Sequence, residues 1–97
     1  MAGKTLDRIR EYTRQDKLKF SKHAYDEMRD DELGEHEIRE TIFSADVRRI
    51  DKDELGRKCY CLEGTTRNFR RVGVVLRLDE NDDKYRIITV YQIFDQP

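Results

Sequence analysis

A run of basic side chains in the second half of the chain is the feature best able to do chemistry. Arg67, Arg70, Arg71 and Arg77 follow one another with no acidic residue among them. Guanidinium groups bind phosphate through paired N–H donors, so this run predicts a surface for RNA or for another acidic partner. The alternative is a solvated sheet face without a ligand, because exposed strands also need long charged side chains to resist aggregation.

Three further side chains have chemistry suited to the same task. Imidazole is the side-chain group best suited to proton transfer at neutral pH, so His23 fits a general base, although a histidine in the first turn of a helix also fits a structural hydrogen bond to the sheet or to a carboxylate. Tyr91 can stack on a base or donate to a phosphate, or it can simply pack within its strand. Lys58 is a candidate RNA contact and a candidate proton carrier.

Four side chains could nominally bind zinc, but their spacing argues against a metal site. Cys59 and Cys61 are two residues apart in an expected strand, and His23 and His36 lie far upstream in expected helices. We predict reduced, partly buried thiols and no metal. No Gly-rich phosphate loop or H-E-x-x-H motif occurs, so we predict no cofactor either.

The elements that must position these residues follow from the hydrophobic periodicity. Apolar residues first recur every three to four positions, which predicts helices, and the first and second helices have Thr5 and Ser21 as expected N-caps. A brief strand is expected between these two helices. The expected helices are 5–15, the segment from Ser21 to the polar stretch at 30–34, and 35–44, and the brief strand is 17–20.

Past Ala45 the period changes to two, which predicts strands. Their connections are too short for parallel crossovers, so we expect a four-stranded antiparallel meander. The predicted fold class is therefore α+β, with N-terminal helices packed on a C-terminal four-stranded antiparallel sheet. The expected strands are 46–52, 58–63, 70–78 and 85–94.

One face of the third strand is expected to be buried. That face carries Val72, Val74, Leu76 and Leu78, and the opposite face carries Arg71 and Arg77. The last strand is apolar on both faces, so periodicity does not assign its buried side. If Ile88 and Val90 face the core, then Thr89 and Tyr91 share a surface with Arg71 and Arg77.

Length and composition bound the protein class. Ninety-seven residues without a linker predict a single domain over residues 1–97. The net charge of −1 hides segregation, because residues 47–77 carry nine basic and four acidic side chains, whereas residues 26–40 carry eight acidic and two basic ones. No apolar run reaches the ~20 residues of a membrane span and no signal peptide is evident, so we expect a cytoplasmic protein without a membrane partner.

Two motifs in the right order give a family resemblance. The segment Phe20-Ser21-Lys22-His23-Ala24 with Met28, and the later run Ile87-Ile88-Thr89-Val90-Tyr91, resemble the signature of DUF4258, a domain of unknown function, over about residues 17–94. Many members of that family have Arg just before the Met and again three residues after it, where this chain has Glu27 and Asp31. A role of those arginines therefore does not transfer to this chain.

The layout of that family is similar to RelE and BrnT type toxins, which are small ribonucleases of toxin–antitoxin pairs. The resemblance implies an endoribonuclease or RNA-binding domain that acts through Arg71, Arg77 and Tyr91, with His23 or Lys58 moving protons. Its partners would be RNA, the ribosome or an antitoxin-like protein. The alternative is a non-catalytic protein-interaction module that docks through the acidic helices of residues 26–40 or through the basic sheet.

Overall fold

The computed structural model describes residues 2–94, which form three helices and one five-stranded sheet. The helices match the predicted periodicity closely, except that the first begins before Thr5. Thr5 lies inside this helix, so its predicted role as N-cap is wrong, whereas Ser21 caps the second helix as expected by accepting from the Ala24 amide at 3.0 Å. The helices are α1 (Ala2–Arg14), α2 (Lys22–Asp30) and α3 (Glu35–Ser44).

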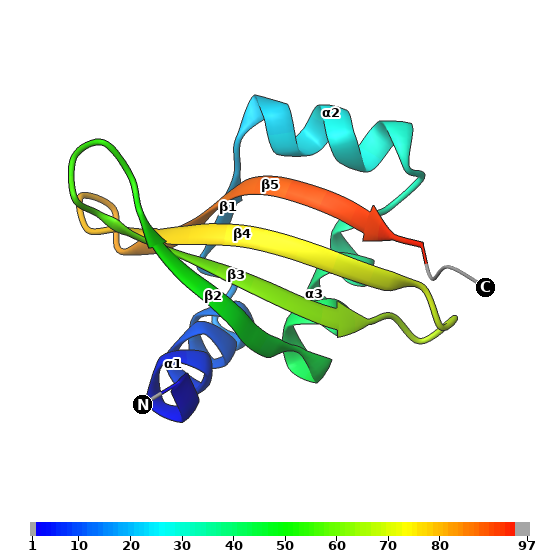
Figure 1. The fold of residues 1–97 in the computed structure, drawn as a ribbon, viewed down its shortest axis with the longest axis horizontal. Coiled ribbons are helices and arrows are strands. Elements are labelled where there is room, and N and C mark those ends of the chain that lie inside the picture. The colour runs from blue at the N-terminus through cyan, green and yellow to red at the C-terminus, as the bar shows by residue number, and fades with distance from the viewer. Residues whose placement is uncertain (1, 95–97) are drawn as a thin grey trace.

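The sheet is mixed and has the order β1-β5-β4-β3-β2 (Figure 1). The predicted four-stranded antiparallel sheet is wrong in one respect, because the brief strand β1 joins the sheet in parallel with β5, with Lys19 opposite Arg86. The parallel pairing is possible because α2 and α3 and the first three C-terminal strands lie between these two segments and supply the long connection it needs. The strands are β1 (Leu18–Phe20), β2 (Asp46–Lys52), β3 (Lys58–Thr65), β4 (Arg71–Asp79) and β5 (Lys84–Ile93).

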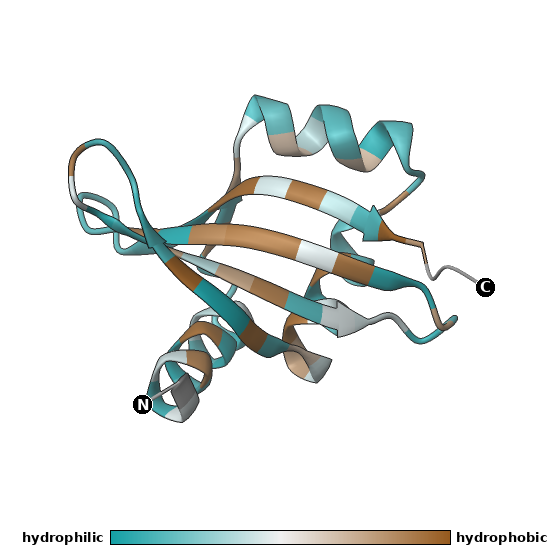
Figure 2. Ribbon diagram, in the orientation of Figure 1, coloured by the Kyte–Doolittle hydropathy of each residue, from teal (hydrophilic) through white to brown (hydrophobic). Residues whose placement is uncertain are grey.

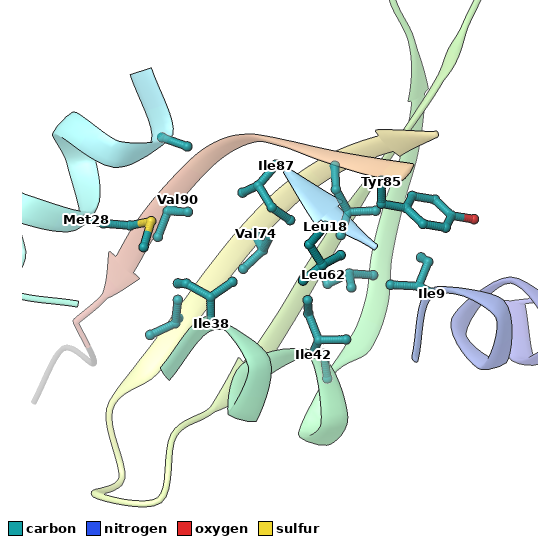
Figure 3. Packing of buried hydrophobic residues seen from close by; sticks show 14 of the residues in the cluster. Ile9, Leu18, Met28, Ile38, Ile42, Leu62, Val74, Tyr85, Ile87 and Val90 are labelled. Carbon is teal, nitrogen blue, oxygen red and sulfur yellow. The ribbon is translucent and has the colours of Figure 1, made fainter. Parts of the chain in front are cut away.

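The hydrophobic core lies between one face of the sheet and the helices α1 and α3, and α2 adds Met28, which packs near Val90 at the edge (Figure 3). Val72, Val74 and Leu76 of β4 are fully buried there, as the alternation predicted, and Leu78 is partly buried. Ile38 and Ile42 of α3 pack on this face and have no exposed surface. Figure 2 shows the result along β4, which is hydrophobic in its middle and hydrophilic at both ends.

A bulge in β5 decides which of its residues face the core. The register with β4 shifts so that Leu76 pairs with Ile87 but Val75 pairs with Thr89, which leaves Ile88 as the extra residue. Tyr85, Ile87 and Val90 are therefore all buried although their numbers do not share one parity. Because a bulge switches the side on which later residues point, sequence alternation alone could not assign this strand.

The helix α2 runs along the free edge of β5 beyond β1 (Figure 1). The Ser21 hydroxyl donates to the Ile88 carbonyl at 3.0 Å, and the Glu27 carboxylate accepts from the Val90 amide at 3.0 Å. These side chains satisfy backbone groups that an edge strand would otherwise leave open. No helix within residues 2–94 is long and apolar enough to span a membrane.

The face of the sheet opposite α1 and α3 carries no helix, and we call it the open face (Figure 1). Paired residues of neighbouring strands point to the same side, so the strand register assigns its members. They are Lys19 of β1, Asp46, Arg49 and Asp51 of β2, Cys59, Cys61, Glu63 and Thr65 of β3, Arg71, Gly73, Val75, Arg77 and Asp79 of β4, and Lys84, Arg86, Thr89, Tyr91 and Ile93 of β5.

Candidate functional site

Tyr91 lies across the middle of the open face. It is paired with Gly73 of β4, and its ring occupies the space that a side chain at Gly73 would fill. The ring can therefore cross β4 and reach β3, where its hydroxyl lies 3.1 Å from Glu63 Oε2 and 3.2 Å from Cys61 Sγ. A glycine inside a strand thus gives Tyr91 its position.

The hydroxyl of Tyr91 is a hydrogen-bond donor in this site. Burial raises the pKa of Tyr91 far above its ordinary value, and the neighbouring Cys61 and Glu63 raise this pKa further. The other carboxylate oxygen of Glu63 accepts from Arg48 Nε at 3.1 Å. Glu63 is thus held between a phenol and a guanidinium, beside a cavity of about 190 Å³ that Arg48, Glu63 and Arg71 help to line.

A row of basic side chains crosses three adjacent strands at the other end of the open face. Lys19 of β1 is opposite Arg86 of β5, and Arg86 is directly opposite Arg77 of β4. The nearby Asp79 is already bound by Lys19 Nζ at 2.6 Å, and this contact lowers the pKa of Asp79. Within residues 2–94, neither Arg77 nor Arg86 makes an ion pair or a side-chain hydrogen bond.

Like charges directly opposite each other on neighbouring strands are destabilising. Arg86 lies between Arg77 and Lys19, and Lys19 is itself bound by Asp79 and by Asp82 at 2.9 Å, so the repulsion is strongest between the two arginines. An anion placed above the row would turn this repulsion into attraction, and the planar fork of each guanidinium suits phosphate oxygens. We call Lys19, Arg77 and Arg86 the basic row.

A groove of about 490 Å³ lies at the same end of the sheet and is lined by Lys58 and Arg77 and also by the carboxylates of Asp79 and Glu80. The helix α1 contributes Arg8, whose pKa is raised by its hydrogen bond to the Tyr85 hydroxyl. Arg57 also lines the groove but is bound to Asp53 at 2.7 Å. Lys58 has no ion pair or side-chain hydrogen bond among the residues that the structure describes, so it adds an available cation to the groove, on the side of the sheet that faces α1.

His23 lies on α2 at the edge of β5 and is separate from the Tyr91 cluster. Its ring is exposed, and Nε2 is 3.3 Å from Glu27 Oε1. The same oxygen of Glu27 accepts from the Val90 amide, so His23 lies next to a carboxylate that anchors α2 to the sheet. This position agrees with the structural alternative for His23, and within residues 2–94 no hydrogen bond joins it to Tyr91 or Arg77.

The arginines of the β3–β4 turn have separate surroundings. The guanidinium of Arg70 donates to the carbonyl oxygens of Asp31 and Glu32 and to the Gln92 side chain, and it lies 3.5 Å from Glu37. These contacts tie the turn to the connection between α2 and α3, so Arg70 is engaged inside the fold. The side chain of Arg67 is 90% exposed, and its Nε atom is 3.9 Å from Glu40 Oε2, which is a loose contact. The guanidinium therefore remains accessible to a ligand.

The cysteines are free thiols on the same side of β3. Cys61 is buried under Tyr91, and burial raises the pKa of Cys59. Within residues 2–94, no group of three or more His, Cys, Asp and Glu side chains is arranged to hold a metal ion.

The structure thus divides the predicted site residues between several places. Arg71, Arg77 and Tyr91 share the open face; of the two residues on which that expectation depended, Val90 is buried and Ile88 is the extra residue of the bulge. Lys58 lies at the same end of the sheet as Arg77 but on the side of Tyr60, which faces the helices, and His23 and Arg70 lie elsewhere. Residue patterns had not singled out the groups that contact or flank these residues. The groups missed are Arg8, Arg48, Glu63 and Arg86, and Cys61 was considered only as a nominal zinc ligand. The one available signal for this arrangement was the glycine at position 73 inside a strand.

One family of proteins has a sequence model that matches residues 20–92, and its description is "Domain of unknown function (DUF4258)". The match confirms the predicted resemblance and begins after α1, so Arg8 lies outside it. Neither a curated protein nor a solved structure matches the chain. The likeness to RelE and BrnT type toxins therefore stays a prediction.

Proposed function

We propose that this chain, which belongs to the DUF4258 family of domains of unknown function, binds RNA through the open face of its sheet. The observation that carries the proposal is the basic row. Arg77 and Arg86 face each other on neighbouring strands and make no ion pair with any residue of 2–94, whereas Lys19 beside them is bound by Asp79 and Asp82. Phosphate groups are the ligands that such a row binds best.

The surroundings of the row support the same ligand. Lys58 and Arg8 add cations to the adjoining groove on the side of α1, where Asp79 and Glu80 also line it, and Arg71 is a further cation of the open face at the start of β4. These residues are spread over the length of a strand, which is about 20–30 Å for nine residues. A backbone with regularly spaced phosphates can contact several of them at once, whereas a small anion cannot.

The binding test is fluorescence anisotropy of a labelled RNA at several salt concentrations. We expect Arg77→Ala with Arg86→Ala to weaken binding at least tenfold and to reduce the salt slope by about 1.4, because each contact to a single strand contributes about 0.7. The matched control is Lys22→Ala with Arg29→Ala, which removes two exposed cations from α2. Equal loss in both double variants would show that only net charge matters, and the basic row would not be the site.

RNA cleavage is a second candidate, favoured by the arrangement around Glu63. Its carboxylate lies between the Tyr91 hydroxyl and Arg48, beside the cavity that Arg71 also lines. In the proposed reaction Glu63 takes the proton of a 2′-hydroxyl, the oxygen attacks the adjacent phosphorus, and the 5′-oxygen leaves with a proton from the Tyr91 hydroxyl. The arginines would stabilise the charge that develops on the phosphate oxygens.

The cleavage test uses purified protein with RNA, with and without ribosomes. We expect Glu63→Gln and Tyr91→Phe each to lower the cleavage rate by at least a hundredfold with little change in RNA affinity, since general acid–base catalysis contributes about 10²–10⁴-fold. Glu54→Gln, an exposed carboxylate in the β2–β3 turn, is the control. A wild type that binds RNA and leaves it intact would restrict the function to binding.

The protein-interaction module is the competing hypothesis. Several acidic side chains of residues 26–40 are already occupied within the protein, since Asp26 pairs with Lys22 and Arg29, and Glu37 contacts Arg70 and the Gly34 amide. The acidic helices therefore offer less free charge than their composition indicated. An antitoxin-like partner would instead meet the basic open face, and it would compete with RNA there.

A further inference from the structure

The turn between β3 and β4 holds a phenylalanine in a conformation that favours glycine. Phe69 has φ of +66°, in the left-handed region, and its side chain is 87% exposed. A residue with a Cβ is strained there, and a bare phenyl ring in water is unfavourable. Both features would be relieved by a glycine, yet the most exposed of the large apolar side chains of residues 2–94 stands at this position.

The geometry of the turn does not depend on the phenyl ring. The Phe69 amide donates to the Thr66 carbonyl at 3.0 Å, and the Thr66 amide donates to the Arg70 carbonyl at 2.9 Å. The buried Thr66 hydroxyl accepts from the Arg70 amide at 3.1 Å and also donates to Asn68. Backbone groups and Thr66 therefore build the turn, and the ring of Phe69 is held out into solvent.

The neighbours of Phe69 are cationic and aromatic. Arg67, two residues earlier in the turn, is 90% exposed, and Arg71, two residues later, opens β4 on the open face. Arg71 is paired with Ile93, so the exposed Phe94 follows at the same end of the sheet. A rigid aromatic ring between two arginines is complementary to a nucleobase between two phosphates.

We infer that Phe69 is a stacking platform for an unpaired nucleobase, and that the RNA bound by the open face is single-stranded at this end. The inference rests on the proposed RNA binding and adds the class of RNA. A base inside a duplex is stacked on both sides and cannot present its face to Phe69, whereas an unpaired base can. Stacking tolerates any base, so the platform selects strandedness rather than sequence.

An RNA strand with one base stacked on Phe69 can continue along β4 to the basic row. Arg71 and Arg77 are the first and seventh residues of β4, which places them about 20 Å apart. Several nucleotides are therefore needed to contact both ends of the face. We expect affinity to rise with oligonucleotide length until both the platform and the basic row are occupied, and then to change little.

The test compares a labelled single-stranded RNA with the same sequence paired in a duplex. We expect the wild type to prefer the single strand, and Phe69→Ala to weaken its binding about tenfold without changing the salt slope, since no charge is removed. Phe69→Trp should keep the affinity, and its fluorescence should be quenched when RNA is added. Leu55→Ala, which removes an exposed apolar side chain from the β2–β3 turn, is the matched control and should bind like the wild type.

The outcomes separate this inference from the proposed function. If the wild type binds RNA and Phe69→Ala binds it with the same affinity, Phe69 is not a stacking platform, and the proposed RNA binding still stands. If the wild type binds neither the single-stranded RNA nor the duplex, both the stacking platform and the proposed RNA binding are wrong. If Phe69 instead serves contact with a second copy of the chain, sedimentation would show a wild-type dimer that Phe69→Ala abolishes, with RNA affinity unchanged, and the platform would again be wrong.

Discussion

Replacing Phe69 with glycine should make the protein more stable. The left-handed conformation costs a residue with a Cβ about 1–2 kcal/mol, and Phe69 has φ of +66°. Glycine removes this strain but adds about 0.5–1 kcal/mol of backbone entropy lost on folding. Because the ring is 87% exposed, little buried area is lost with it. The expected gain in the free energy of unfolding is therefore about 0.5–1 kcal/mol.

Thermal unfolding followed by circular dichroism would measure this gain as a rise in Tm of about 2–8 °C. Phe69→Ala keeps the Cβ and the strain, so it should stay within about 0.5 kcal/mol of the wild type. Gly56→Ala provides the opposite case, because Gly56 has φ of +77° in open space, and the variant should lose about 1 kcal/mol by strain alone. An unchanged or lower Tm for Phe69→Gly would refute the reasoning, whereas a more stable protein that binds RNA less well would show that Phe69 is retained for function.

Three further substitutions test how the site is held. Gly73→Ala should cost about 1–3 kcal/mol in chemical denaturation because its methyl group displaces Tyr91, and the cost should shrink when Tyr91→Ala is added. Arg70→Ala should lower the free energy of unfolding by about 2 kcal/mol in the same measurement, since it leaves two carbonyl oxygens of the α2–α3 connection without their donor. A loss below about 0.5 kcal/mol would show that these hydrogen bonds do not stabilise the fold. Asp79→Asn should destabilise the protein at neutral pH, and this effect should vanish as the pH falls. Lys19 lowers the pKa of the Asp79 carboxyl in the folded state, so the carboxylate stabilises the fold fully above about pH 4 and stops doing so as the pH falls through that lowered pKa. An effect of Asp79→Asn that persists unchanged in acid would exclude the ion pair as its cause.

Local pattern predicted most of the secondary structure. The helix α3 and the strand β2 have the bounds that periodicity indicated, and the buried side of β4 is correct from Val72 to Leu76. These features are local, because the spacing of apolar side chains along a short segment fixes which of them can be removed from water together. The family was also recognisable from two short motifs, and the match to residues 20–92 confirms it.

Sequence patterns predicted the pairing of distant segments less well. Three residues of β1 gave a weak strand signal, and nothing in their sequence specified parallel pairing with β5. The bulge at Ile88 changed the direction of every later side chain in β5, which decided that Tyr91 lies on the open face. Strand register depends on hydrogen bonds between segments far apart in the chain, so it is not encoded in the alternation of either strand alone.

The candidate site shows the same division. The sequence by itself identified Arg71, Arg77 and Tyr91 as residues with suitable chemistry, and it determined that the first two point to the same side of one strand. Only the tertiary structure decided which charges remain available, because an arginine is neutralised by whatever the fold brings beside it. Arg70 is used inside the fold, whereas Arg77 meets another cation, Arg86, across the sheet, and that cross-strand contact exists only once β4 and β5 are paired.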